Sequence, residues 1–424
     1  MFLGMPPSRW WVLIFSRLWL NAGVRLAYPF LPTIARGLGI GMEQAGFLVA
    51  ARSFVGLSGI AFGFLSEKKG EKVGLLVGLA FFSLGGLSIG LYRTYPWVLA
   101  GFILMGLAHA VYNPAVQSYV SAHVPYAGRA RALGLLESSW SMGWFVGMPV
   151  GGFLIARYGW HVPYGALGLI GIVLFLATTR LPAAPLDSGT AFDPCRRRPE
   201  PSRKMPETKT PNPVPPIGQA ARTDANAAPH RRLWPALGVT FFALFANESL
   251  MLVYGAWMEA RFDVGIGSLG LLSTVIGFME LGAELSVALI VDRLGKKRAL
   301  AAGLLGAAAG YACLLAAPTS LGASIAVFAM IAYFFEFTVV SSFPYVSELN
   351  PNARGRWLSA NYSLMVAGRV AGALTGPWLW EHTHSLHGHT ALGLLATGAA
   401  LAFLGIAPNP DGTEKRACEG ENHP

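Results

Sequence analysis

The stretch that decides the fold occurs twice in the chain. The first copy reads Gly63-Phe64-Leu65-Ser66-Glu67-Lys68-Lys69-Gly70-Glu71-Lys72, and the second reads Ala288-Leu289-Ile290-Val291-Asp292-Arg293-Leu294-Gly295-Lys296-Lys297. In each copy an apolar run ends in a carboxylate, and a base, a glycine and further bases follow. Glu67 and Asp292 are 225 positions apart, and so are Gly70 and Gly295. The repeat predicts two halves of similar architecture.

The same spacing continues along the rest of the chain. The further pairs that it relates are Arg129 with Arg354, Arg131 with Arg356, Gly143 with Gly368, and Gly147 with Gly372. A register that holds over this length indicates one architecture built twice. Two parallel halves made of membrane helices are typical of transporters.

The composition predicts a membrane protein. Hydrophobic residues make up 53% of the chain and charged residues only 13%, which is too apolar for a soluble domain. A membrane helix needs about 20 mostly apolar residues. The apolar runs predict twelve spans, near residues 10–34, 44–66, 73–92, 96–119, 132–156, 161–180, 235–258, 266–291, 299–317, 321–345, 357–380 and 390–407.

The expected fold class is therefore an all-α membrane protein with twelve transmembrane helices in two pseudo-symmetric six-helix bundles. The first span contains Arg17, Asn21 and Arg25, so we interpret it as retained and not as a cleaved signal peptide. The expected domains are an N-terminal bundle (1–180), a disordered cytoplasmic linker (181–233), a C-terminal bundle (234–408) and a cytoplasmic tail (409–424). The linker is rich in proline and bases and has little apolar surface to bury.

Lysine and arginine predict the orientation. With the N-terminus in the cytoplasm, the inner segments outside the linker hold fourteen of these bases and the outer segments hold four. We therefore expect both termini in the cytoplasm and the protein in the inner membrane. The net charge of +10 is then a topology signal and not an indication of nucleic-acid binding, for which no module is present.

These motifs resemble those of the major facilitator superfamily, and the resemblance covers nearly the whole chain except the linker and tail. The family's loop motif between spans 2 and 3 is filled here by Gly63, Leu65, Glu67, Lys68, Gly70 and Lys72. The second copy keeps Asp292, Arg293 and Gly295 but has Ala288 where glycine is usual. The resemblance implies a gate at the inner helix ends, in which Glu67 and Asp292 would pair with bases such as Arg129 and Arg354 in one conformation.

Span 5 resembles the glycine–proline motif of the family's antiporter branch. Its members here are Gly143, Gly147, Pro149, Gly151 and Gly152. Glycines permit close helix packing, and a proline frees a backbone carbonyl and bends the helix. Ordinary helix packing without a gating role is the alternative interpretation.

Polar and charged residues within the spans are candidates for function, because they are costly at bilayer depth. The resemblance implies that spans 1, 4, 7 and 10 line a central cavity. The expected substrate-site residues are Asn21, Arg25, His109, Asn113, Glu248 and Glu336. Three of the four intramembrane arginines lie in the first half and most of the glutamates lie in the second, so Arg–Glu pairing between the halves is one possibility. Buried pairs that only hold helices together are the alternative.

Carboxyl groups in apolar surroundings take up protons more readily. The proton-coupling candidates are Glu248, Glu280, Glu284 and Glu336. The expected function is secondary active transport of a small molecule by alternating access, with proton-coupled efflux as the first hypothesis. Proton-coupled uptake of a small organic anion is the second, because the bases in span 1 depart from the drug-antiporter pattern. A non-transporting membrane sensor is the third.

Other classes of activity are not expected. The sequence contains no HExxH motif and no GxxxxGK[ST] nucleotide-binding loop, so we do not expect an enzyme. We expect no cofactor, with the proton gradient as the energy source, and a protein that acts as a monomer in the lipid bilayer. The three cysteines lie far apart, and the histidines between His382 and His389 are interpreted as a polar outer loop, so no metal site is predicted.

Overall fold

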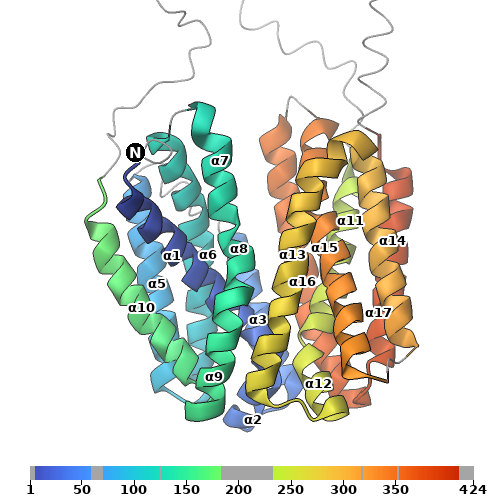
Figure 1. Ribbon diagram of the computed structural model, residues 1–424, viewed down its shortest axis with the longest axis horizontal. Coiled ribbons are helices and arrows are strands. Elements are labelled where there is room, and N and C mark those ends of the chain that lie inside the picture. Colours follow the sequence, from blue (N-terminus) through green and yellow to red (C-terminus); the bar gives the residue numbers. More distant parts are fainter. Residues whose placement is uncertain are drawn as a thin grey trace, which may run out of the picture.

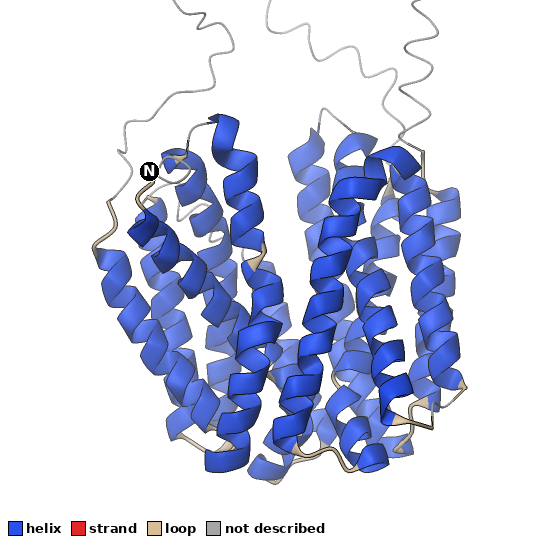
Figure 2. Cartoon of the chain, viewed as in Figure 1, coloured by secondary structure: helices blue, strands red, loops and turns tan. Residues whose placement is uncertain are grey.

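The computed structural model describes residues 5–58, 70–124, 126–182, 233–316, 319–350 and 353–409. These residues are almost entirely helical and contain no strand (Figure 2). The helices of the first half are α1 (Pro7–Arg25), α2 (Ala27–Leu38), α3 (Met42–Val55), η1 (Gly56–Ser58), α5 (Glu71–Leu91), α6 (Tyr95–His123), α7 (Tyr126–Glu137), α8 (Ser139–Met142), the π-helical segment η2 (Gly143–Gly147), α9 (Met148–Tyr158) and α10 (Val162–Thr179).

The second half repeats this order with fewer breaks. Its helices are α11 (Trp234–Met251), α12 (Tyr254–Phe262), α13 (Ile266–Leu294), α14 (Lys296–Leu315), α15 (Leu321–Leu349), α16 (Arg354–Thr383) and α17 (His387–Ile406). Where the predicted spans lie within the described residues, each coincides with one of these helices or with a consecutive group of them; residues 59–66 of the span predicted near 44–66 lie outside the described residues. Eight segments of the described chain are long and apolar enough to cross a membrane.

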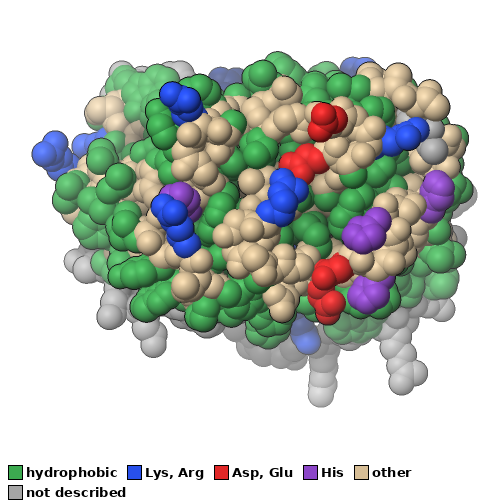
Figure 3. Space-filling view, turned by 90° about the horizontal axis from the view of Figure 1, so that it is seen from below, with side chains coloured by type: hydrophobic (Ala, Val, Ile, Leu, Met, Phe, Trp, Pro, Cys, Tyr) green, Lys and Arg blue, Asp and Glu red, His purple; other side chains and the backbone are tan. Residues whose placement is uncertain are grey.

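The helices form two groups that stand side by side (Figure 1). One group holds α1 to α10 and the other holds α11 to α17. The start of α1 and the end of α17 lie on one face, which we call the terminus face, and the opposite face is called the far face. Figure 3 views the far face, where charged and histidine side chains lie among hydrophobic ones.

The two groups pack together toward the far face and diverge toward the terminus face (Figure 1). The main contacts between them are α3 with α16, α9 with α13, and α2 with α12. The helix α7, by contrast, packs on α1, α6 and α8 of its own group. A Cβ atom placed on Gly46 of α3 would lie 2.5 Å from the Ala373 carbonyl oxygen of α16, so only glycine permits this approach.

Two interruptions of the first-half helices determine where the functional side chains lie. The first span breaks at Leu26, just before Pro29, whose missing N–H cannot pair with the Arg25 carbonyl. The Arg52 side chain of α3 donates a hydrogen bond to the Val24 carbonyl at this break (2.9 Å). The second interruption is η2, which widens span 5 immediately before α9 and Pro149.

Candidate functional site

A small cavity lies between the two halves, at the level of both interruptions. It encloses about 30 Å³ of free space, which is room for about one water molecule. The residues that line it are Arg25, Tyr28, Trp140, Trp144, Asn247, Glu248, Met251, Ile276, Glu280, Ala332, Phe335, Glu336 and Arg369. Arg25, Glu248 and Glu336, three of the six predicted substrate-site residues, are in this set.

The strongest contact in the cavity is an ion pair between Arg25 of the first half and Glu280 of the second. The Arg25 Nη1 atom lies 3.2 Å from Oε1 of Glu280, and Nη2 lies 2.5 Å from Oε2. The two side chains are only 3% and 8% exposed. The guanidinium also lies over the rings of Trp140 (4.0 Å) and Trp144 (4.7 Å). Bidentate geometry and two aromatic faces compensate for the removal of this arginine from water.

Tyr28 and Ser141 of the first half also donate hydrogen bonds to carboxylates of the second half. The Tyr28 hydroxyl lies 3.1 Å and 3.0 Å from the two carboxylate oxygens of Glu248. Outside the cavity lining, one turn along α13 toward the terminus face, the Ser141 hydroxyl donates to Glu284 at 2.9 Å. In all three contacts the donor belongs to the first half and the carboxylate belongs to the second.

Two charged residues of the cavity lack such a partner. Glu336 is buried and makes no hydrogen bond or ion pair within the described residues. Arg369 lies 5.8 Å from the centre of the Trp140 ring. The cavity lining therefore holds the three carboxyl groups Glu248, Glu280 and Glu336 against two guanidinium groups.

The other three predicted substrate-site residues lie within the first half. Asn21 donates to the Ser139 hydroxyl (3.4 Å), and His109 Nε2 lies 3.0 Å from the Leu20 carbonyl oxygen. Asn113 in turn lies 3.2 Å from His109 Nδ1. Asn21 and His109 thus connect different elements of the first half, whereas Asn113 contacts its own helix α6, and none of the three lines the cavity.

The sequence analysis missed the aromatic wall of the cavity. Trp140 and Trp144 are four residues apart, so a helix places them on one face, and they adjoin the glycine motif of span 5. That spacing beside intramembrane arginines was the available signal. Arg369 and Asn247 also line the cavity and are not among the predicted site residues.

The predicted gate lies partly outside the described residues. This applies to Gly63, Glu67 and Lys68, and to the side chain of Arg129. In the second copy, Asp292 makes no ion pair with Arg354 within the described chain, while Lys296 pairs with Glu348. The gating role of these residues stays a prediction.

The glycines of the repeated stretch confirm the similarity of the two halves. Gly70 precedes α5 with φ of 88°, and Gly295 precedes α14 with φ of 86°. Their ψ angles are also similar, at 150° and 138°. Positive φ is unfavourable for residues with a side chain. The repeat thus preserves one backbone conformation at the start of the third span of each half.

The glycines of span 5 face neighbouring helices. A Cβ atom on Gly147 would lie 2.7 Å from the Ala22 Cβ atom of α1, and one on Gly152 would lie 3.1 Å from the Gly270 Cα atom of α13. Gly143 and Gly151 also face α1 and the break at Leu26. These glycines therefore pack span 5 against both halves, and their role in gating stays a prediction.

The histidines of the last far-face turn are separated by the structure. His382 and His384 lie at the end of α16, whereas His389 is buried, with Nε2 2.8 Å from the Gly376 carbonyl oxygen. Within the described residues, no group of three or more His, Cys, Asp or Glu side chains is arranged to hold a metal ion.

Comparison with known proteins gives a consistent result. The family model of the Major Facilitator Superfamily matches residues 13–234 and 236–421. The uncharacterized MFS-type transporter YceJ of Bacillus subtilis is 23% identical over 91% of this chain and 93% of its own length. The quinolone resistance protein NorA of Staphylococcus aureus is 25% identical over 42% of this chain and 46% of its own length.

A solved structure has the same fold. The D-xylose-proton symporter superimposes with a TM-score of 0.73 and 17% identity, and the match covers 96% of this chain and 98% of that one. The twelve-span architecture, the repeated stretch and the family match extend over both halves of the chain. This protein therefore belongs to the major facilitator superfamily and is a multi-pass membrane transporter, not an enzyme.

Proposed function

We propose that this protein exports a small molecule across the inner membrane by exchange for protons, as a monomer with both termini in the cytoplasm. The orientation is supported by the excess of lysine and arginine on the terminus face. Export is supported by the similarity to a quinolone resistance protein and by the glycine–proline motif of span 5. The terminus face is then the cytoplasmic side, and this conformation faces inward.

One observation carries the proposed proton coupling. Three carboxylates of the second half, Glu248, Glu280 and Glu284, each accept a hydrogen bond from the first half. Protonation neutralises a carboxylate and so weakens such a contact, most of all the Arg25–Glu280 ion pair. Proton binding therefore changes the free energy of contact between the halves. Alternating access requires this kind of link between a bound ion and the position of the halves.

The substrate is expected to compete with these internal contacts. The cavity has room for about one water molecule, so a solute must separate the halves around it before it can bind. Trp140, Trp144 and Phe335 offer apolar surface, and Glu336 offers a carboxyl group that makes no hydrogen bond or ion pair within the described residues. A substrate that draws Glu280 or Glu248 away from its donor would leave that carboxylate free for a proton.

A second candidate function is uptake of a small organic anion together with protons. It is favoured by Arg25 and Arg369, which line the same cavity. If Glu280 were protonated, Arg25 would become available to an anionic group of the substrate. In that case the proton and the substrate would bind to the same conformation.

The test is proton flux in proteoliposomes that contain the full chain, with an imposed pH gradient and a panel of lipophilic cations, organic anions and sugars. Proton movement opposite to the substrate supports export, and movement in the same direction supports uptake. Glu248→Gln, Glu336→Gln and Arg25→Ala should reduce coupled flux at least tenfold, whereas Glu71→Gln, at the terminus face, should not. Normal coupling in all three cavity variants would contradict the proposed site.

A further inference from the structure

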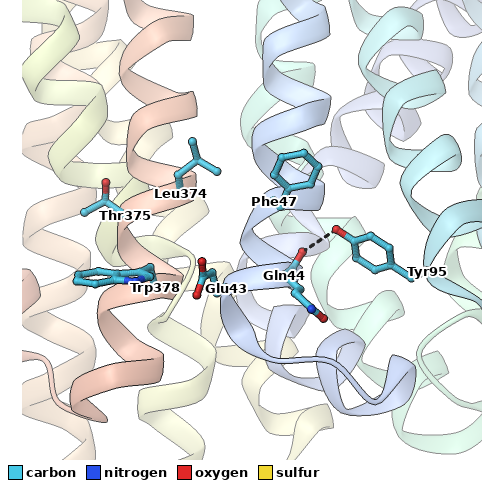
Figure 4. Close-up of a pocket in the computed structure, with 7 residues that line it drawn as sticks. All are labelled: Glu43, Gln44, Phe47, Tyr95, Leu374, Thr375 and Trp378. Carbon is cyan, nitrogen blue, oxygen red and sulfur yellow. Dashed lines mark hydrogen bonds between the residues drawn. The ribbon is translucent and has the colours of Figure 1, made fainter.

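A second cavity opens on the side of the molecule, at the seam between the two halves (Figure 4). It is a groove of about 620 Å³ near the far face. One wall is α3 with Glu43 and Phe47, and the other is α16 with Leu374 and Trp378. Tyr95, at the start of α6, closes one end, and its hydroxyl donates to the Gln44 carbonyl at 3.3 Å.

The walls of this groove come from different halves and meet at its floor. Gly46 packs directly on the Ala373 carbonyl of α16 there. The Glu381 carboxylate of α16 accepts a hydrogen bond from the Glu43 backbone N–H, at 2.7 Å, in the first turn of α3. The groove therefore exists only while the far face is closed, because movement of α3 away from α16 would separate its walls.

The chemistry of the groove is amphiphilic. Phe47 is 48% exposed and Trp378 is 45% exposed, and together with Leu374 they give it an apolar lining. The Glu43 carboxylate lies at the far-face end, and no lysine or arginine is among the lining residues. Within the described residues, this carboxylate makes no hydrogen bond or ion pair. Tyr95 and Trp378 are residue types that occur at the level of lipid head groups.

We propose that the groove binds a phospholipid whose head group carries a primary ammonium, and that the bound lipid stabilises the conformation that is closed at the far face. The ammonium group would pair with Glu43 next to the aromatic face of Trp378, and an acyl chain would lie against Phe47 and Leu374. A ligand that binds one conformation better shifts the equilibrium toward it. This second part rests on the proposed alternating access, whereas the binding itself does not.

Lipid retention tests the binding part without any transport. The full chain is purified from vesicles with equal amounts of phosphatidylethanolamine, phosphatidylcholine and phosphatidylglycerol, and the lipids that remain bound are counted by native mass spectrometry. The proposal expects retained phosphatidylethanolamine above the other two. Glu43→Gln and Trp378→Leu should each lower that retention about fivefold, as expected for the loss of about 1 kcal/mol.

The controls separate lipid recognition from misfolding. Glu71→Gln makes the same substitution in the first turn of α5, at the opposite face, and should retain lipid as the wild type does. Equal retention of the anionic lipid, or retention unchanged by Glu43→Gln, would overturn the proposal. Tetraphenylphosphonium, a lipophilic cation, can also be used to displace the retained lipid. If it does so at the same concentration in wild type and in Glu43→Gln, Glu43 does not recognise the cation, and the proposal would also be overturned.

The conformational part has a separate readout. Spin labels at positions 93 and 383 lie in the two halves near the far face, in a variant without the native cysteines. Phosphatidylethanolamine vesicles should favour the short distance between the labels, and Glu43→Gln should abolish the difference from phosphatidylglycerol vesicles. If retention is specific but the distances do not respond, the lipid binds without stabilising the closed far face. Failure of substrate transport would affect neither readout.

Discussion

Arg25 of α1 and Glu280 of α13 form a buried bidentate ion pair that joins the two halves of the protein, with Nη2 of the arginine 2.5 Å from Oε2 of the glutamate. Breaking a buried pair leaves one charge without compensation, which costs about 3–5 kcal/mol. Arg25→Leu and Glu280→Leu should therefore each lower the melting temperature strongly. The double variant Arg25→Leu/Glu280→Leu should recover most of the loss, because no charge remains buried. A double variant as unstable as the sum of the single variants would show that the two residues act independently.

The approach of α3 to α16 provides a second prediction. A side chain at Gly46 would collide with the Ala373 carbonyl, so Gly46→Val should hold the far face open and abolish transport. Each half should still fold. The measurement is the distance between labels at positions 93 and 383, which should lengthen. Gly265→Ala is the control, because a Cβ atom there meets no other atom within 4 Å. An unchanged distance in Gly46→Val would contradict the proposed role of this contact.

A third prediction concerns the cap on α3. Glu381 accepts a hydrogen bond from the first turn of that helix and also interacts favourably with its dipole. Glu381→Ala should weaken the contact between α3 and α16 by about 1 kcal/mol. The Glu43 amide should then exchange its hydrogen about fivefold faster. Glu259→Ala removes the neighbouring pair with Arg36, which is 59% exposed. Its effect on this amide should be smaller, because exposed ion pairs contribute little.

The repeated glycines allow a matched pair of substitutions. Gly70→Ala and Gly295→Ala both place a Cβ atom on backbone with positive φ, and each should destabilise the protein by about 1–2 kcal/mol. Unfolding in a mild detergent, followed by circular dichroism, measures this loss. Gly267→Ala lies in the first turn of α13 with open space around it and should be nearly neutral. A neutral Gly295→Ala would show that the second copy does not need the conformation.

The sequence was sufficient for the spans, because twelve long apolar runs have few alternatives in a bilayer. It also predicted that arginines of the first half could pair with glutamates of the second. It could not identify the partners, because Arg25 can reach Glu280 only through the rotation of α1 and the break at Leu26, which depend on packing. The aromatic wall was missed for a related reason, since tryptophans in a membrane protein are most readily interpreted as interfacial anchors.

His109 and Asn113 were predicted to line the cavity but do not, and the reason is again packing. Hydropathy places them at depth in α6, but only packing determines that the His109 side chain contacts Leu20 of α1 and that Asn113 contacts His109, and not the second half. Periodicity defines the faces of a helix, whereas the direction of each face is a property of the assembled bundle.

The direction of the cavity contacts bears on the ancestry of the chain. In the register of the repeat, Arg25 corresponds to Leu250 and Glu280 corresponds to Val55, so the charged partners have no counterparts in the other copy. Two first halves placed together would leave Arg25 facing Val55, and two second halves would leave Glu280 facing Leu250, so each buried charge would lack its partner. Although the copies share one fold, they have diverged into obligate complements, and a half-length fragment of either kind is electrostatically unsuited to pair with itself.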